Sequence, residues 1–208
     1  MSPKISNDQK EQRRLQILEA GKRVFTAKGY AEATLKDIVE ETGMSRGWIY
    51  LYFQTKEEIF EALLDYQDAE YDNQLQITLR NQSRVWEVIR GNFLQLQEEL
   101  CTGLGQSFYP AFYEYFLTGS RDGARKSMLL KRYEDGINRF SELLQRGIDQ
   151  DEFKPQMPVR DIARIIASYQ EGIVTHSVAV GTETANSQVQ IQALLDYLKQ
   201  LLNLESEE

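Results

Sequence analysis

The sequence predicts an all-α protein, and three observations support this fold class. Apolar residues recur at the helical spacing i, i+3, i+4 and i+7 almost continuously along the chain. Alternating runs of β-branched residues between turn residues are missing, so strand signals are nearly absent. The 208 residues are 41% hydrophobic, which is enough to bury the core of one or two domains.

The first two helices have clear start and stop signals. One helix is expected over residues 8–28, and Gly29 is suited to end it in a left-handed conformation. Its buried face consists of Ile17, Leu18, Gly21, Val24 and Phe25. A second, short helix starts at Thr34, because Thr34 and Asp37 have the spacing of a capping box. This helix is expected to end at residues 42–43.

The same signals predict the remaining helices. Ser45 is a natural N-cap for a third helix over residues 45–52. A fourth helix begins at Thr55, with Glu58 at the capping-box position, and extends into the seventies. Residues 151–158 include two prolines and break the chain. Longer amphipathic helices are expected over residues 84–100, 108–117, 124–149, 159–180 and 189–204.

Composition excludes several classes of protein. One Cys and one His cannot form a disulfide framework, a zinc finger or a His-rich metal site. The chain has no apolar run near the roughly 18 residues of a membrane-spanning helix, and residues 1–16 lack the apolar core of a signal peptide. The sequence therefore predicts a cytoplasmic protein with no membrane partner, no metal and no other cofactor.

Charge is distributed unevenly along the chain. The net charge is −8, yet residues 1–30 hold seven basic against three acidic residues. Residues 61–208 hold 14 basic against 23 acidic residues. A basic end on an acidic body is typical of a protein whose two parts have different partners, although ordinary surface variation gives the same pattern.

Residues 34–53 have the sequence form of a helix-turn-helix. Gly43 permits the tight turn in which two helices cross steeply. At 100° per residue, a third helix that turns Ile49 into the core presents its opposite side to the outside. That side carries Gly47, Trp48, Tyr50 and Leu51. A short helix with such an exposed face needs a partner surface.

The major groove of DNA suits this face chemically. Arg46 can pair with guanine or a phosphate, Gly47 allows close approach, and Trp48 can lie against a thymine methyl or a sugar. The hydroxyls of Tyr50 and Tyr52 can bond to phosphates. The starts of the second and fourth helices suit the same role, at Thr34, Lys36 and Lys56. The alternative is that the aromatic residues pack against neighbouring helices, which applies to Tyr52 above all.

A set of short motifs in this region resembles the N-terminal domain of TetR-type transcriptional regulators over residues 10–60, without a gap. These motifs are Gly29-Tyr30, Ala33-Thr34, Asp37-Ile38-Val39, Gly43-Met44-Ser45-Arg46-Gly47, Ile49-Tyr50-Leu51-Tyr52-Phe53 and Lys56-Glu57-Glu58-Ile59-Phe60. Residues 131–155 also resemble the C-terminal domain of YfiR-type members. Residue 48 is more often small or aliphatic in the family, so Trp48 leaves the base preference open.

The resemblance implies a homodimer that binds a palindromic double-stranded DNA operator, usually as a repressor that a small molecule releases. It implies a helix-turn-helix domain at residues 1–54 and a helical ligand-binding and dimerisation domain at residues 55–208, joined through a shared helix. The implied DNA contacts are Thr34, Lys36, Ser45, Arg46, Gly47, Trp48, Tyr50, Tyr52 and Lys56. Lys10, Arg13 and Arg14 are interpreted as solvated surface, with contacts to flanking phosphates as the alternative.

Aromatic residues are concentrated at residues 108–116 of the acidic body, on an arc too wide for one helix contact. Pro110 can start or kink that helix and open space beside it. We therefore predict an effector pocket, with plain core packing as the alternative. Its expected lining is Trp86, Phe93, Phe108, Phe112, Tyr113 and Phe116.

The last two helices are expected to pair with those of a second copy, because the helix at 159–180 carries a second stripe of small residues beside its main apolar stripe. The predicted dimer interface consists of Ala163, Ala167, Val174, Leu194, Leu198 and Leu201. His176 is expected in a core or an interface, with a role in ligand binding or pH sensing as the alternative. Cys101 is expected to pack on a helix face.

Two other classes of function remain as alternatives. An enzyme is disfavoured because the chain has no Walker A motif, no nucleophile elbow and no zinc-binding HExxH motif. A helical interaction module would use the exposed aromatic helix as a protein-binding surface. Salt dependence separates this module from a DNA reader, because only phosphate binding weakens steeply with salt.

Overall fold

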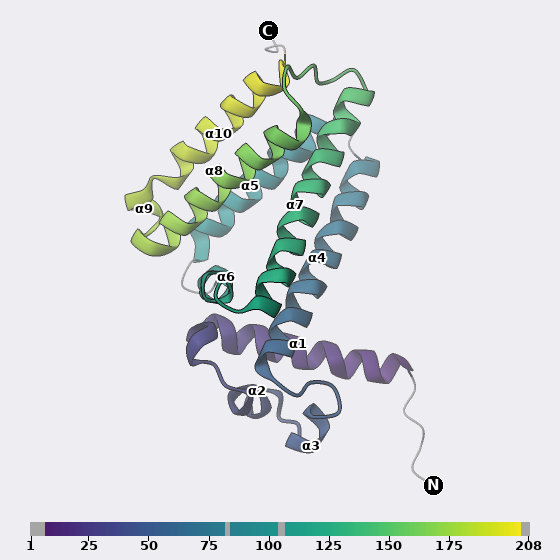
Figure 1. Ribbon diagram of the computed structural model, residues 1–208, viewed down its shortest axis with the longest axis vertical. Coiled ribbons are helices and arrows are strands. Elements are labelled where there is room, and N and C mark those ends of the chain that lie inside the picture. Colours follow the sequence, from purple (N-terminus) through teal and green to yellow (C-terminus); the bar gives the residue numbers. More distant parts are fainter. Residues whose placement is uncertain (1–6, 82–83, 104–106, 205–208) are drawn as a thin grey trace. The chain divides into compact units, whose positions relative to one another are not determined.

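The computed structural model describes residues 7–81, 84–103 and 107–204, and these residues form helices and loops without a strand (Figure 1). The predicted all-α class is confirmed. The helices are α1 (Asn7–Glu32), α2 (Leu35–Thr42), α3 (Arg46–Ile49), α4 (Lys56–Asn81), α5 (Val85–Gly103), α6 (Tyr109–Gly119), α7 (Gly123–Asp149), α8 (Val159–Val180), α9 (Thr182–Ala185) and α10 (Ser187–Leu202).

The chain divides into two compact units. Unit 1 comprises Met1–Gln74 and Pro110–Tyr115, and unit 2 comprises Leu75–Tyr109 and Phe116–Glu208. The boundaries therefore fall inside α4 and α6, each of which contributes residues to both units. Unit 1 holds α1, α2, α3 and α4 as far as Gln74, together with Pro110–Tyr115 of α6.

Local signals set the helix limits in unit 1. The regular backbone of α1 is interrupted at Gly29, whose φ of 77° is in the region that favours glycine. The capping box of α2 is formed as predicted, and Gly43 ends this helix in the left-handed conformation with φ 66°. Both stop signals coincide with glycines that the sequence analysis identified.

The third helix is shorter than expected. After Ile49 the backbone tightens, because the N–H of Leu51 bonds to the carbonyl of Trp48 and that of Tyr52 to the carbonyl of Ile49. These i to i−3 bonds, at 3.2 and 2.9 Å, end the regular helix, although the N–H of Phe53 still bonds to the carbonyl of Ile49 at 2.9 Å. Residues 50–52 are therefore a turn that follows α3.

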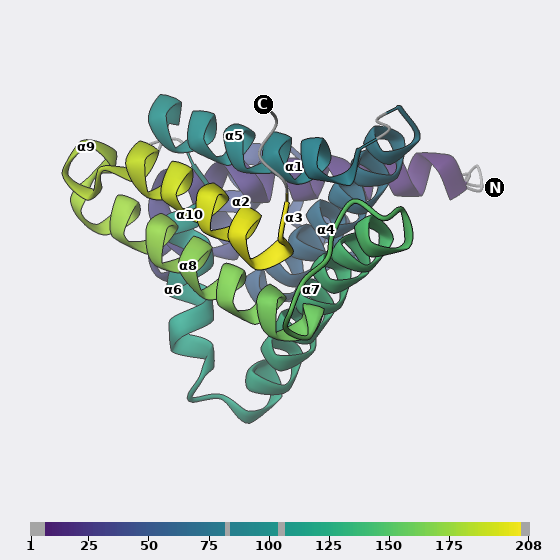
Figure 2. The ribbon, with the colours of Figure 1, turned by 90° about the horizontal axis from the view of Figure 1, so that it is seen from above.

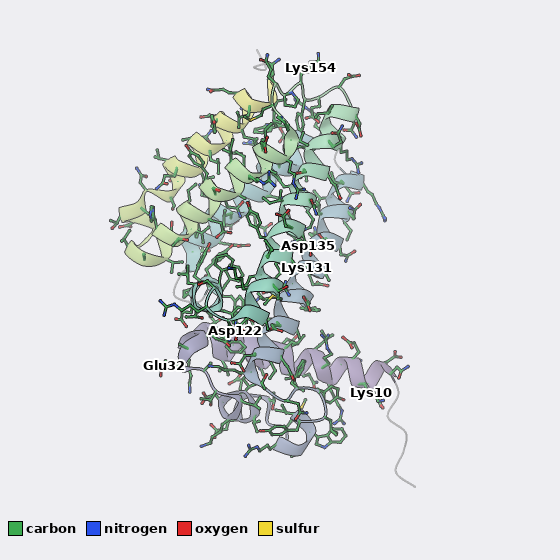
Figure 3. All side chains as sticks on the ribbon, in the orientation of Figure 1. Lys10, Glu32, Asp122, Lys131, Asp135 and Lys154 are labelled. Atoms are coloured by element: carbon green, nitrogen blue, oxygen red, sulfur yellow. The ribbon has the colours of Figure 1, made fainter. Side chains whose placement is uncertain are left out.

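Unit 2 is built from long antiparallel helices. α8 packs against α7 and α10, and α5 packs against α7 and α10 (Figures 1 and 2). The bounds of α8 are those predicted, and α7 begins one residue before the predicted start, after its N-cap Asp122. The Oδ1 of Asp122 accepts from the N–H groups of Ala124 and Arg125, which lowers the pKa of this carboxyl (Figure 3). The short helix α9 was not expected.

The loop between α7 and α8 is anchored to the unit 2 core. Phe153 is buried, and its ring lies directly over Gly147 of α7. The carboxylate of Glu152 accepts from the N–H groups of Val85 and Trp86 at 2.7 and 3.1 Å, which caps the start of α5. The predicted break at residues 151–158 is thus an ordered connection.

Within residues 7–81, 84–103 and 107–204, no helix is long and apolar enough to span a bilayer. The same residues hold no group of three or more His, Cys, Asp or Glu side chains placed to bind a metal ion.

Candidate nucleic-acid interface

The start of α2 is fixed by a hydrogen-bonded network. The backbone N–H of Thr34 donates to Oδ2 of Asp37 at 2.9 Å, and the N–H of Asp37 donates to Oγ1 of Thr34 at 3.2 Å. The Lys28 ammonium donates to Oδ1 of Asp37 at 2.7 Å. The hydrogen bonds from Lys28 and Thr34 lower the pKa of Asp37 to about 2. The network therefore holds Thr34 and the exposed Lys36 at a rigid helix end.

One face of α3 is buried and the other is open, as the angular analysis predicted. Ile49 is 0% exposed, whereas Leu51, in the turn that follows, is 72% exposed. Gly47 is exposed, and a Cβ built on it would meet no atom within 4 Å. Its φ is also ordinary, so neither packing nor backbone conformation inside the protein requires glycine at this position.

Arg46 and Tyr50 form a preassembled pair on the open side of α3. Nη2 of Arg46 donates to the hydroxyl oxygen of Tyr50 at 2.9 Å. The guanidinium carbon lies 5.2 Å from the centroid of the Tyr50 ring. The pair limits the rotamers of both side chains, so less conformational entropy is lost when they bind a partner.

Trp48 lies against α1. The guanidinium carbon of Arg13 is 4.2 Å from the centroid of the Trp48 ring, which is within the range of a cation–π interaction. Trp48 is half-buried, as are Tyr50 and Tyr52. The aromatic residues therefore combine packing within the protein with partial exposure, and the two interpretations given for them do not exclude each other.

Lys56 is held inside unit 1. Its ammonium donates to the carbonyl oxygens of Tyr30, Ala31 and Ala33 at 2.8, 3.1 and 2.8 Å, and it lies 4.6 Å from the centroid of the Tyr30 ring. These bonds use all three of its protons to cap the end of α1. For Lys56 to contact a phosphate as predicted, its ammonium must therefore give up one of these three hydrogen bonds and donate that proton to the phosphate.

An aromatic cluster that the sequence analysis did not identify joins α6 to this unit. The ring of Tyr115 lies 4.8 Å from that of Tyr30 and 4.6 Å from that of Phe60. Its hydroxyl donates to Oε1 of Glu61 at 2.6 Å, and Oε2 of Glu114 accepts from the N–H of Ala31 at 2.9 Å. The aromatic run at residues 108–116 was the available signal, but it was interpreted only as a pocket lining.

The predicted effector residues do not gather in one unit. Phe112 and Tyr113 belong to unit 1, where their ring centroids are 5.4 Å apart. Unit 2 contains the other four, of which Trp86 and Phe93 are buried and Phe116 is 39% exposed. Because the six predicted residues are divided between two units, the effector pocket stays a prediction.

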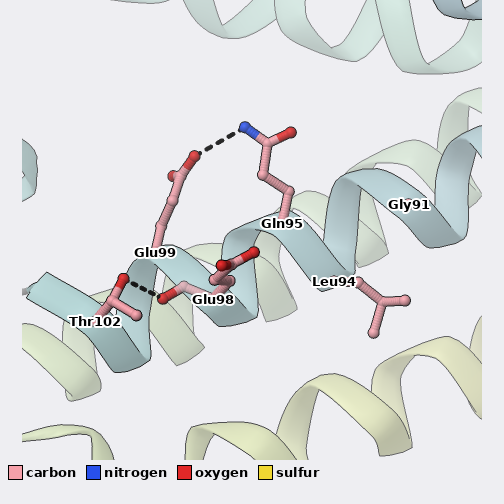
Figure 4. Close-up of a pocket in the computed structure, with 6 residues that line it drawn as sticks. All are labelled: Gly91, Leu94, Gln95, Glu98, Glu99 and Thr102. Atoms are coloured by element: carbon pink, nitrogen blue, oxygen red, sulfur yellow. Dashed lines mark hydrogen bonds between the residues drawn. The ribbon is translucent and has the colours of Figure 1, made fainter.

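One hollow of about 720 Å³ lies on unit 2, along a single face of α5 (Figure 4). It is lined by Gly91, Leu94, Gln95, Glu98, Glu99 and Thr102. None of these residues belongs to the predicted aromatic lining. Cys101, on the same helix, is exposed, so the expectation that it packs on a helix face is wrong.

The helices expected to form the dimer interface bury most of the predicted residues in the protomer itself. Ala163, Val174, Leu194 and Leu198 are at most 2% exposed in the single chain, so their side chains have almost no surface for a second copy. Ala167 and Leu201 are half-buried. The exposed residues of these helices include Tyr169, His176 and Val180 on α8 and Val189 and Tyr197 on α10. His176 is thus not a core residue.

Comparison with known sequences finds two matching families. Residues 17–63 match the family described as bacterial regulatory proteins, tetR family, and residues 91–188 match the tetracyclin repressor-like C-terminal domain. The chain is 38% identical over 202 residues to the HTH-type transcriptional regulator YfiR of Bacillus subtilis, covering 97% of this chain and 98% of that protein. It is 35% identical over 186 residues to the HTH-type transcriptional repressor AcnR of Corynebacterium glutamicum, covering 86% and 88%.

Solved structures show the same fold. A TetR-family regulator from Cytophaga hutchinsonii superposes with a TM-score of 0.72 at 21% identity, over 99% of this chain and 100% of that chain. The transcriptional regulator FadR of Bacillus subtilis, in complex with stearoyl-CoA, superposes with a TM-score of 0.64 at 21% identity, over 88% and 96%.

Proposed function

The chain belongs to the TetR family of helix-turn-helix transcriptional regulators, and we propose that it is a ligand-responsive repressor that binds a palindromic operator as a homodimer. A small molecule releases it from the DNA. The observation that carries the proposal is the open side of α3, where Gly47 is not required by the fold and Arg46 is already aligned on Tyr50.

Each proposed contact has a distinct chemical role. Arg46 reads guanine or binds a phosphate, Gly47 lets α3 approach the groove, and Trp48 contacts a thymine methyl or a sugar. Tyr50 and Tyr52 donate to phosphates. Ser45, whose side chain makes no cap bond to α3, adds a hydroxyl donor at the helix start. Thr34, Lys36 and Lys56 complete the set as phosphate contacts from α2 and α4.

Dimerisation follows from the small size of one reading surface. One helix-turn-helix makes few phosphate contacts, and a two-fold pair doubles them at half-sites one helical turn apart. We place the dimer face on the exposed side of α8 and α10. The rings of Tyr169 and Tyr197 lie 6.0 Å apart there and join the two helices, and Val180 adds apolar surface. A monomer at micromolar concentration by light scattering would contradict this part of the proposal.

Release is proposed to be geometric. α4 and α6 each contribute residues to both units, so a displacement of either helix in unit 2 passes along the helix into unit 1. In unit 1 the bonds of Glu114 to Ala31 and of Tyr115 to Glu61 fasten α6 to α1 and α4. An effector that moves these helices would disturb the spacing of about 34 Å that successive major grooves require.

The effector site is proposed around the aromatic residues Trp86, Phe93, Phe108, Phe112, Tyr113 and Phe116. A Phe112→Ala variant tests this assignment once an inducer is identified. A folded variant with an unchanged response would remove Phe112 from the site. If the distance between the two α3 helices of the dimer is the same with and without a working effector, the release mechanism is contradicted.

The decisive experiment is selection of bound fragments from a random duplex pool at two salt concentrations. Enrichment of an inverted repeat that is lost with Arg46→Ala or Tyr50→Ala supports the dimeric reader. A folded dimer that enriches no sequence at either salt, with or without cell extract as a source of effectors, contradicts it and favours a protein-binding module. Apolar protein contacts would also show little salt dependence.

A further inference from the structure

The N-terminal helix carries a cation that is fixed to the reading surface. Arg13 lies on α1, 35 positions before Trp48 in the sequence, yet its guanidinium is stacked on the Trp48 ring at 4.2 Å. Both residues are half-buried. α1 is thereby linked to α3 through a side chain that belongs to the proposed DNA contacts.

The neighbouring Arg14 differs from Arg13 in its partners: its guanidinium carbon lies farther from a ring, 6.0 Å from the centroid of Phe53, and it also has a carboxylate partner. Nη1 of Arg14 pairs with the carboxylate of Glu11 at 3.2 Å, so its charge is compensated within α1. Across the part of the chain that the structure describes, no carboxylate lies within 4.0 Å of the Arg13 guanidinium. Arg13 therefore brings to the side of α3 a positive charge that has no ion-pair partner among the described residues.

Stacking leaves the hydrogen-bonding capacity of the guanidinium intact. The guanidinium carries five N–H donors in its own plane, and a cation–π contact uses none of them in a hydrogen bond. A planar cation with free in-plane donors matches the oxygens of a phosphate in one or two bonds. The indole ring holds the guanidinium in place, so less rotamer entropy is lost on binding.

We propose that Arg13 binds a DNA backbone phosphate beside the bases contacted by α3, and that Trp48 positions it by stacking. This inference rests on the proposed DNA-binding function. It assigns to Trp48 a second role, because the ring face that Arg13 covers is not available to a base. Through Arg13, α1 thus extends the DNA-contacting surface beyond the helix-turn-helix itself.

The first test compares Arg13→Gln with the matched control Arg14→Gln on the selected operator. The apparent affinity is measured by fluorescence anisotropy at several salt concentrations. Each phosphate contact contributes about −0.9 to the slope of log K against log salt, and a dimer has two copies of Arg13. We expect Arg13→Gln to make the slope less steep by about 2 and to weaken binding about tenfold or more at low salt. Arg14→Gln should change the slope by less than half as much.

The second test asks whether Trp48 positions Arg13. The affinity of the Trp48→Leu variant is compared with that of Trp48→Leu combined with Arg13→Gln. If stacking positions the guanidinium, the loss caused by Arg13→Gln should be clearly smaller in the Trp48→Leu background than in the natural protein. Fully additive losses would overturn the positioning role.

A spectroscopic test of the stack needs no DNA. The chain has two tryptophans, so Trp86→Phe leaves Trp48 as the sole indole fluorophore. In that background Arg13→Gln should increase quenching by acrylamide, since it uncovers one ring face, and Arg14→Gln should not. Unchanged quenching would contradict the stacked arrangement.

The outcomes separate the inference from the function on which it rests. A natural protein that enriches an inverted repeat, together with an Arg13→Gln variant of unchanged salt slope, overturns the phosphate contact and leaves the DNA reader in place. A natural protein that enriches no sequence at either salt overturns both. Thermal melts of each variant confirm that the comparison is made between folded proteins.

Discussion

Replacing Gly47 by alanine should strengthen the fold and weaken DNA binding. A Cβ at this position would meet no atom of the protein within 4 Å, and the backbone has no positive φ. Alanine in a helix is more favourable than glycine by about 0.5–1 kcal/mol, because glycine loses more backbone entropy on folding. For a chain of this length, that gain raises the midpoint of thermal unfolding by about 1–4 °C.

The same methyl group would face the DNA. If α3 lies against the groove at Gly47, the added Cβ occupies space that a base edge or a sugar needs. Insertion of a methyl into a well-packed contact costs about 1–3 kcal/mol, which is a loss of affinity of about fivefold to a hundredfold. The affinity for the selected operator is measured by anisotropy, and the unfolding midpoint by circular dichroism without DNA.

Gly136→Ala is the matched control. Gly136 lies on α7 of unit 2 and likewise has no atom within 4 Å of a Cβ built on it, and its φ is not positive. It should give a similar gain in stability with no change in DNA affinity. Equal DNA affinities for the two variants would refute the argument that Gly47 serves the groove. A marked loss of stability in Gly47→Ala alone would show that the fold itself requires the glycine.

Three further predictions concern contacts that stabilise the two units. Lys56→Met removes three hydrogen bonds to carbonyls and should lower the free energy of unfolding, measured by urea titration, by about 2–3 kcal/mol. The control Lys36→Met, at an exposed position, should change this free energy by less than about 0.5 kcal/mol, and equal effects of the two variants would contradict the capping role of Lys56. The pKa of Asp37 is lowered to about 2, so the stabilisation that its carboxylate gives is complete above about pH 4 and is lost as the pH falls toward 2. The urea midpoints of the natural protein and of Asp37→Asn should therefore converge between pH 4 and pH 2. A constant difference between the two midpoints down to pH 2 would contradict the lowered pKa. Gly147→Ala places a Cβ 2.1 Å from a ring carbon of the buried Phe153 and should lower the thermal midpoint, at a cost of about 1–3 kcal/mol; an unchanged midpoint would mean that the ring moves freely.

Much of the fold was predictable because helix limits are set by local chemistry. The start of α2 at Thr34, its end at Gly43 and the bounds of α8 depend on caps, turn residues and apolar spacing within a few positions. The third helix was predicted too long, since the tight i to i−3 bonding after Ile49 has no distinct residue signature. The four-residue helix α9 is too short for any periodicity to indicate it.

The proposed site was predictable at the level of faces but not of partners. Angular spacing placed Ile49 inward and Gly47 outward, as the structure has them. The same reasoning identified apolar stripes on α8 and α10 but assigned Ala163 and Leu194 to a second copy, whereas both lie in the protomer's own core. Periodicity shows that a face is buried and gives no information about which surface buries it.

The sequence by itself determined the all-α class, the helix-turn-helix and the residues that α3 turns outward, because these depend on short-range caps and on the 3.6-residue period. Only the tertiary structure decided how the charged and aromatic side chains are used. Lys56 caps carbonyls at least 23 positions away, Arg13 stacks on Trp48, and Tyr115 joins Tyr30 from 85 positions further along the chain. Such pairs form where burial of apolar faces brings together helices that are distant in sequence. Because the hydrophobic effect is not directional, the partner of a polar or aromatic side chain is fixed only when the whole core has packed.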